Sequence, residues 1–237
     1  MNRVLFLLIT LLGFYNLIWA QDDPEYRMEL GAGVGLVNYE GDFNGKLFSS
    51  MQPMFSVVGR YVMNPYSNFR LPVGYGKLKG SSENVSTFYP DFSNNVSQKV
   101  NYNFSSSLVD VSLIYEYNFW PYGTGRDYRG ARRLTPYILI GLGTTYAKYG
   151  KDIEGKSGSA FTANVPLGIG LKYKVAERLN LGLEWAMHFS MSDKLDGAKD
   201  PYGIVSSGLF KNTDCYSLLQ ATLTYSFSPK CQTCNKD

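Results

Sequence analysis

Hydrophobic and polar residues alternate along Val109–Tyr122, which reads VDVSLIYEYNFWPY. The odd positions hold aliphatic and aromatic residues: Val109, Val111, Leu113, Tyr115, Tyr117 and Phe119. The even positions are polar apart from one isoleucine: Asp110, Ser112, Ile114, Glu116 and Asn118. Because successive side chains of a β-strand point to opposite faces, the stretch predicts a strand with one face suited to hydrocarbon and the other suited to carboxylates and amides.

Seven other segments alternate in a similar way and are separated by turn-forming residues. They are Tyr26–Tyr39, Met54–Val62, Phe69–Leu78, Thr135–Ala147, Phe161–Lys174, Leu179–Ser192 and Ser217–Ser228. The alternation in the second segment is less regular and does not decide which of its residues face inward. Pro72 cannot donate to a sheet ladder, so it predicts a bulge in the third segment. Most segments are long enough for the roughly 9–11 residues that a tilted membrane strand requires.

The connections between the segments alternate in length. NPYSN (64–68) and VAER (175–178) are short, whereas the connections after the first, third, fifth and seventh segments are long and polar. Short turns on one side and long loops on the other are typical of bacterial outer-membrane barrels. A soluble β-sandwich would also alternate, but the faces rich in Gly, Thr, Asn and Gln would make a poor outer surface for one. The prediction is therefore an all-β, antiparallel, up-and-down transmembrane barrel of about eight strands.

The N-terminal residues resemble a signal peptide. Arg3 is followed by the apolar run Val4–Phe14, and a polar segment begins after Ala20. An N-terminal membrane anchor is the alternative. The domain prediction is a signal peptide at 1–20, a barrel at 21–228 and a periplasmic tail at 229–237. Both ends of the barrel then lie on the periplasmic side of the outer membrane.

Composition supports an exported β-protein and excludes some partners. Aromatic residues make up 15% of the chain, and charged residues only 18%, below the usual quarter. A net charge of +3 without a basic motif does not favour nucleic acid binding. No phosphate loop, EF-hand loop or nucleotide fingerprint is present, so we expect no cofactor, metal, catalytic residue or small-molecule substrate.

The polar faces predict a network inside the barrel, because the interior of an eight-stranded barrel is just filled by side chains. We expect carboxylates to pair there with Arg27, Arg60 or Lys172. The predicted lumen network is Glu29, Arg60, Glu116, Lys172, Glu184 and His188.

His188 and Ser190 suggest an enzymatic alternative. With Asp193 they could form a hydrolase constellation, and they loosely resemble the His-x-Ser motif of outer-membrane lipid A deacylases. Their parity places both on the lumen side, whereas cleavage of lipid requires them to face the membrane. A lumen histidine held by hydrogen bonds is the favoured interpretation.

The three cysteines suggest neither a redox motif nor a zinc site. Cys231 and Cys234 lie in the tail as CQTC, without the helix that normally follows a redox CxxC. Cys215 begins the last predicted strand and is too far along the chain to pair with the tail inside one barrel. A local disulfide between Cys231 and Cys234 is the alternative to two free thiols in the tail.

One connection on the short-turn side is long and basic. It reads PYGTGRDYRGARRLTP and contains Arg126, Arg129, Arg132 and Arg133. A solvated turn is the simplest interpretation. The alternative is a docking site for an acidic partner, which we state as a hypothesis.

Four strings of residues resemble the PorG-type barrels of the type IX secretion system of Bacteroidetes. They are ELGAGVGLVNYEGDFNG at Glu29–Gly45, YEYNFWPYG at Tyr115–Gly123, TPYILIGLG at Thr135–Gly143 and SDKLDG at Ser192–Gly197. Lys194 and Gly197 depart from that family's usual residues, which leaves open a paralogue with a different role.

The resemblance implies a barrel of OmpX- or OmpA-like size that has no enzymatic activity. It also implies association with a periplasmic ring, made of a lipoprotein and its partner protein, besides the surrounding outer-membrane lipids. Besides the lipid-modifying enzyme, the alternative is a stand-alone adhesin-like barrel that uses long outer loops such as Gly80–Asn103.

Overall fold

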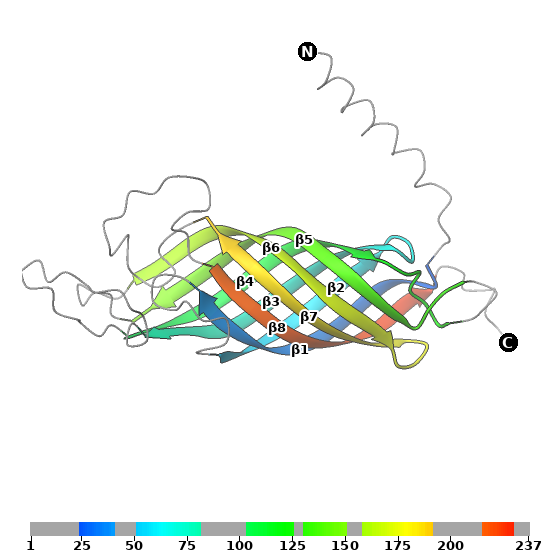
Figure 1. Ribbon diagram of the computed structural model, residues 1–237, viewed down its shortest axis with the longest axis horizontal. Helices are drawn as coiled ribbons and strands as arrows, with labels where there is room; N and C mark the ends of the chain where they lie inside the picture. Colours follow the sequence, from blue (N-terminus) through cyan, green and yellow to red (C-terminus); the bar gives the residue numbers. More distant parts are fainter. Residues whose placement is uncertain are drawn as a thin grey trace, which may run out of the picture.

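Eight antiparallel strands form a closed barrel in which each strand pairs with its neighbours in chain order and β8 closes against β1 (Figure 1). The computed structural model describes residues 24–40, 51–81, 103–125, 130–150, 158–191 and 215–229. The strands are β1 (Tyr26–Glu40), β2 (Gln52–Val62), β3 (Ser67–Ser81), β4 (Asn103–Asn118), β5 (Leu134–Tyr149), β6 (Gly158–Lys174), β7 (Leu179–Ser190) and β8 (Cys215–Pro229). The predicted fold is therefore confirmed. Within the described residues, no helix is long and apolar enough to cross a membrane.

The barrel has two distinct ends. Tyr26 pairs with Pro229, so the first and last strands begin and end at the same place, which we call the terminal end. The short connections 63–66 and 175–178 lie at this end too (Figure 1). The opposite end, where the connections after β1, β3, β5 and β7 leave the strands, is called the long-loop end.

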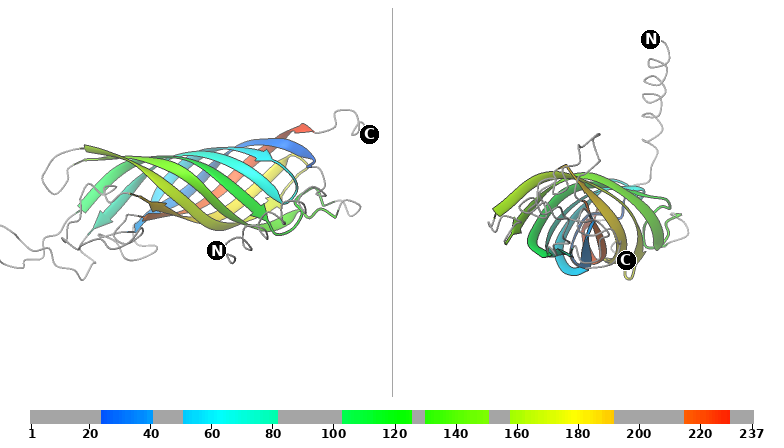
Figure 2. Two further views of the ribbon diagram at one scale, coloured as in Figure 1. Left: turned by 90° about the horizontal axis from the view of Figure 1, so that it is seen from above. Right: turned by 60° about the vertical axis from the view of Figure 1, so that its left-hand side comes forward.

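Strand pairing shows how strongly the strands are tilted. A row of paired residues starts at Met28 in β1, passes through every strand and returns to β1 at Asn38, ten residues further along. Such a stagger requires strands inclined to the barrel axis, and the view from above shows this inclination (Figure 2, left). From β1 to β8, the paired residues in this row lie progressively nearer the long-loop end.

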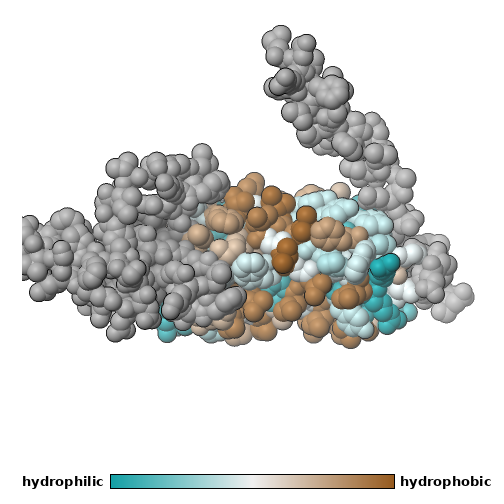
Figure 3. Space-filling model, viewed as in Figure 1, coloured by the Kyte–Doolittle hydropathy of each residue, from teal (hydrophilic) through white to brown (hydrophobic). Residues whose placement is uncertain are grey.

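The outer wall is apolar and the interior is polar, which inverts the arrangement of a soluble protein. Leu142 and Phe161 are 70% and 72% exposed on the wall, whereas Arg70 and Glu116 are 2% and 0% exposed inside. On the face shown in Figure 3, apolar side chains cover the middle of the barrel and polar ones lie toward the terminal end. Exposed apolar residues occur on all eight strands, so we call this apolar zone the belt. This distribution suits a barrel surrounded by hydrocarbon.

Two details of the sequence-based strand prediction are wrong. The strand expected at Val109–Tyr122 begins earlier, at Asn103, and ends at Asn118. Pro72 causes no bulge: Arg70 faces Ile114 and Val73 faces Val111, so both strands use the same number of residues across the gap. The pairing of β3 with β4 is interrupted at Pro72 without a change of register, because proline lacks only the donor.

Apolar side chains fill the interior near the long-loop end. This cluster consists of Val37, Tyr39, Met54, Leu78, Leu108, Ala147, Tyr216 and Leu218. A second, smaller cluster contains Ile114, Tyr137, Leu139 and Ala186. Ile114, the residue that breaks the alternation of β4, therefore points inward as its parity requires.

Candidate functional site in the barrel interior

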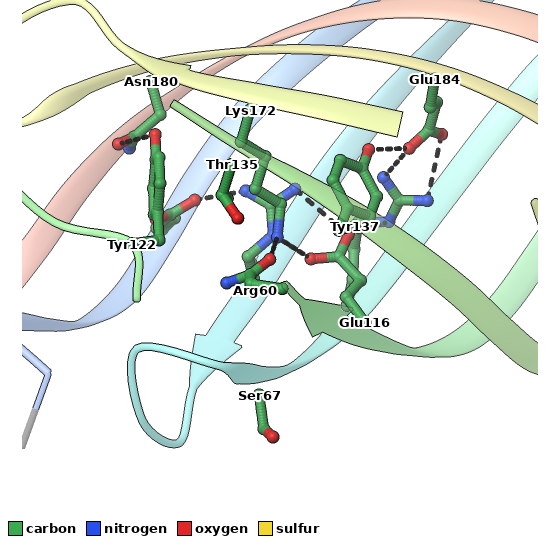
Figure 4. Close-up of polar contacts among 12 residues, drawn as sticks. Arg60, Ser67, Glu116, Tyr122, Thr135, Tyr137, Lys172, Asn180 and Glu184 are labelled. Carbon is green, nitrogen blue, oxygen red and sulfur yellow. Dashed lines mark hydrogen bonds and ion pairs between the residues drawn. The ribbon is translucent and has the colours of Figure 1, made fainter. Parts of the chain in front are cut away.

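Glu116 is the centre of a layer of ion pairs that crosses the barrel (Figure 4). Its carboxylate accepts a hydrogen bond of 2.9 Å from Arg60 Nε and lies 3.1 Å from Arg70 Nε. Lys172 donates to the same carboxylate from the other side of the barrel. One fully buried carboxylate therefore holds three cations that come from β2, β3 and β6.

Two further carboxylates extend this layer to the remaining strands. Glu29 accepts from Arg60 and, at 3.0 Å, from the Thr224 hydroxyl. Glu184 pairs with Arg70 and accepts a hydrogen bond of 2.7 Å from the Tyr137 hydroxyl. The layer thus takes one residue from each of the eight strands: Glu29, Arg60, Arg70, Glu116, Tyr137, Lys172, Glu184 and Thr224. We refer to these eight residues as the charged layer.

The charged layer is balanced, with three carboxylates and three cations. Arg60 and Arg70 are direct cross-strand partners, an arrangement that would be repulsive without the carboxylate between them. Glu116 lies against both guanidinium groups. The layer therefore needs Glu116 more than any single cation, because its removal leaves two arginines and a lysine around an uncharged centre.

The structure brings five of the predicted lumen residues into the charged layer: Glu29, Arg60, Glu116, Lys172 and Glu184. The expected role for Arg27 is wrong, because this residue is exposed near the terminal end. Arg70 pairs with Glu184 instead, and the sequence prediction of the layer missed it. Arg70 alternates with the apolar residues of β3, so the sequence indicates that it points into the barrel. Alternation alone does not identify its partner, Glu184, which is 114 residues away.

Gly170 makes room for the aromatic member of the layer. A Cβ at this position would lie 2.5 Å from the ring of Tyr137, so a side chain there would displace the ring. With the ring in place, the Lys172 ammonium lies 4.4 Å from its centroid, within cation–π range. The glycine in β6 therefore allows Tyr137 to contact both Lys172 and Glu184.

Asp110 forms a second polar cluster nearer the long-loop end. It accepts hydrogen bonds from Tyr216 (2.7 Å), Asn164 (2.6 Å), Thr145 (3.1 Å) and Ser112 (2.8 Å). All four donors are neutral. The Asp110 carboxylate is therefore held by neutral hydrogen-bond donors, whereas the Glu116 carboxylate is held by cations. Such a satisfied cluster fixes the packing of a narrow interior.

His188 belongs to this second cluster. Its Nδ1 lies 3.8 Å from an Asp110 oxygen, and its ring stacks on Tyr216 with centroids 4.5 Å apart. Ser190 lies 3.2 Å from the Thr162 hydroxyl. Both side chains are therefore buried inside the barrel, away from the lipid-facing wall. Asp193 lies outside the described residues.

The described interior leaves little free volume. A cavity of about 10 Å³ lies between the charged layer and His188, room for about one water molecule. Among the described residues, no group of His, Cys, Asp and Glu side chains could hold a metal ion. The outer wall has two shallow apolar grooves, of about 490 and 480 Å³, on either side of Ile169 and Trp185. Both are on the belt, where acyl chains would fill them.

The basic connection between β4 and β5 is described at residues 119–125 and 130–133, and this part of it lies across the terminal end. The Tyr122 hydroxyl donates to Asn180 at 3.0 Å (Figure 4). Burial raises the pKa of Tyr122 well above its ordinary value, so the phenol stays protonated and remains a donor. Thr124 is anchored by its amide and hydroxyl to Glu25, at 3.1 and 2.6 Å. The connection therefore lies over the mouth of the barrel.

This anchoring orders two of the four arginines that the sequence singled out. Arg132 stacks on Trp120 at 4.9 Å, and Arg133 Nε donates to the Thr124 carbonyl at 2.9 Å. Both arginine side chains remain exposed. Arg126 and Arg129 lie outside the described residues, as do the Cys231–Cys234 tail and the predicted signal peptide.

An apolar wall, a polar interior and a closed antiparallel sheet define the transmembrane β-barrel class, in the small form known from outer membranes. Within that class, the chain belongs to the family described as Domain of unknown function (DUF6089), whose model matches residues 2–236. No curated protein matches the chain.

Several solved outer-membrane proteins have a similar fold. Neisserial surface protein A (NspA) is 13% identical, with 84% of this chain and 97% of that chain covered and a TM-score of 0.51. Ail of Yersinia pestis, solved with the heparin analogue sucrose octasulfate, is 15% identical, with 87% and 100% covered and a TM-score of 0.45. OprG of Pseudomonas aeruginosa is 9% identical, with 88% and 99% covered and a TM-score of 0.45. At these identities the likeness concerns the fold alone.

Proposed function

We propose that this protein is a non-enzymatic outer-membrane barrel that serves as a structural component of a type IX protein secretion system. In this role it docks to a periplasmic ring of a lipoprotein and its partner protein. The observation that carries the proposal is the combination of a filled interior with an ordered basic connection at the terminal end. The PorG-like strings in β1, β4, β5 and the connection after β7 supply the particular secretion system.

The filled interior supports an anchoring role over transport. The charged layer takes side chains from all eight strands and crosses the lumen. Apolar residues fill the lumen near the long-loop end. A barrel that moved solutes would need a continuous polar path, and both the ion pairs of the charged layer and the apolar cluster lie across the described interior. The barrel is therefore suited to hold a position in the membrane.

The ordered connection supports docking at the terminal end. Arg132 and Arg133 are exposed, and backbone hydrogen bonds hold their main chain. The Arg132 amide donates to the Pro121 carbonyl at 2.7 Å, and the Arg133 carbonyl accepts from the Lys174 amide at 2.8 Å. A preordered charged surface loses less conformational entropy on binding than a mobile one. In outer-membrane barrels the short turns face the periplasm, so the proposed orientation places these arginines and both termini on the ring's side of the membrane.

Affinity purification tests the proposal. A tagged copy is purified from native outer membranes in a mild detergent, and the associated proteins are identified by mass spectrometry. We expect a ring-forming lipoprotein and its partner protein. Recovery of the barrel alone, in a detergent that preserves such rings, would contradict the secretion role.

Charge variants test the docking surface. Replacing Arg132 and Arg133 by glutamine should reduce recovery of the ring, and replacing Arg126 and Arg129 as well should reduce it further. The matched control is Arg27→Gln with Arg178→Gln, which removes two exposed charges from the same end. Equal recovery with the test and control pairs would locate docking elsewhere on the protein.

The enzymatic alternative has its own test. His188→Ala should leave outer-membrane lipids and secretion unchanged if the barrel is structural. Loss of a lipid modification with intact secretion would favour the enzyme. The adhesin-like alternative rests on loops outside the described residues, and protease treatment of intact cells tests their exposure.

A further inference from the structure

Aromatic side chains form a row on the outer wall of β3 to β6 near the long-loop end. Strand pairing places Tyr75 beside Val109, Val109 beside Tyr146 and Tyr146 beside Phe161. The three rings are 53%, 43% and 72% exposed. Exposed aromatic rings of this kind form the girdles at membrane–water interfaces. The row therefore indicates where the apolar belt ends on this side of the barrel.

Lysines and serines form the next row toward the long-loop end. Lys77 pairs with Ser107, Ser107 pairs with Lys148, and Lys79 pairs with Ser105. The three lysine side chains are exposed on the outer face, and no carboxylate within the described part of the chain forms an ion pair with any of them. Within the described part of the chain, this surface therefore carries three positive charges without a partner carboxylate, and serine hydroxyl groups lie beside them. We call Lys77, Lys79, Lys148, Ser105 and Ser107 the lysine patch.

The tilt of the strands brings two of these lysines to one level. A row of paired residues that passes through all eight strands returns to β1 ten residues nearer the long-loop end. Moving from one strand to the next along such a row therefore shifts the position along the barrel axis by a little more than the rise of one residue. Lys148, two strands beyond Lys77, therefore stands about two residues higher, near the level of Lys79. Lys77 and Lys148 lie on either side of Ser107, so their Cα positions are roughly 10 Å apart at 4.8 Å per strand. Lys79 and Lys148 are also offset by two residues along the strands, so their Cα positions are roughly 12 Å apart.

We propose that the lysine patch binds the phosphate groups of anionic lipids in the leaflet at the long-loop end. The patch is continuous with the lipid-facing belt, so its nearest neighbours in the membrane are headgroups. Lysine stems lie along apolar surface while their ammonium groups reach the headgroup layer. Phosphate esters supply the missing negative charge, and the serine hydroxyls donate hydrogen bonds to their oxygens. The proposal is independent of the secretion role.

Native mass spectrometry of the purified, folded barrel measures this binding. The detergent complex is titrated with bisphosphorylated lipid A and, separately, with its dephosphorylated form. The test variant carries Lys77→Gln, Lys79→Gln and Lys148→Gln. The charge-matched control carries Arg27→Gln, Arg132→Gln and Arg178→Gln at the terminal end. Migration of unheated samples on SDS gels verifies that every variant is folded.

We expect the wild-type barrel to bind the phosphorylated lipid more tightly than the dephosphorylated one. The lysine variant should lose roughly 10- to 100-fold in affinity for the phosphorylated lipid only, since each lysine near an anionic surface contributes about a five-fold effect. The arginine control should stay within about two-fold of wild type. Wild-type affinity in the lysine variant, an equal loss in the control, or an equal loss for both lipids would overturn the proposal.

Discussion

Replacing Glu116 by glutamine tests whether the charged layer holds the barrel together. Glu116 is fully buried and lies against Arg60, Arg70 and Lys172. Glutamine has nearly the same shape but no charge. The substitution therefore leaves three buried cations with only Glu29 and Glu184 to balance them.

The expected loss is large for a single substitution. Removing one partner of a buried ion pair costs about 3–5 kcal/mol, because it leaves an uncompensated buried charge. Typical folding stabilities are about 5–15 kcal/mol, so the variant should lose a substantial part of the total. With a urea dependence of about 2–3 kcal/mol per molar, the unfolding midpoint should fall by roughly 1–2 M.

Urea unfolding of the barrel in lipid vesicles, followed by tryptophan fluorescence, measures the effect. The control is Glu177→Gln, which removes the charge of an exposed glutamate in the connection between β6 and β7 and should change stability by less than about 0.5 kcal/mol. Adding Lys172→Met to Glu116→Gln restores the charge balance of the layer. The double variant should be more stable than the sum of the two single effects, by about 1–3 kcal/mol. The reasoning is refuted if Glu116→Gln behaves like the control or if the two effects are simply additive.

Three other predictions follow from the geometry. Gly170→Ala places a methyl group against the Tyr137 ring and should destabilise the barrel by about 1–3 kcal/mol in the same unfolding assay; an unchanged midpoint would show that the ring has room to move. Tyr122→Phe removes the hydrogen bond to Asn180, worth about 0.5–1.5 kcal/mol, so amide hydrogen exchange should increase in the connection between β4 and β5 but not in β7. In planar bilayers the wild-type protein should show no porin-like conductance steps, because side chains fill the described lumen; regular steps would contradict this.

The interior was only partly predictable, for a reason that particular residues make clear. The alternation placed Glu29, Glu116, Lys172 and Glu184 on inward faces, whereas the pattern around Arg60 left its facing open. The structure joins all five in one layer. Period-2 alternation reports the face of a residue but not its height in the barrel. Arg27 was therefore expected to pair inside although it lies near the open terminal end.

The fold class and the direction of most side chains were determined by the sequence itself. Local alternation decides which residues face lipid, because a shift by one residue would expose every inward charge to hydrocarbon. The partners of those charges were decided only by the tertiary structure. Arg70 pairs with Glu184, and Ser107 lies between Lys77 and Lys148, through the stagger with which the eight strands close. That stagger is a property of the whole barrel, since it depends on every strand pair at once, so no single segment of the sequence contains it.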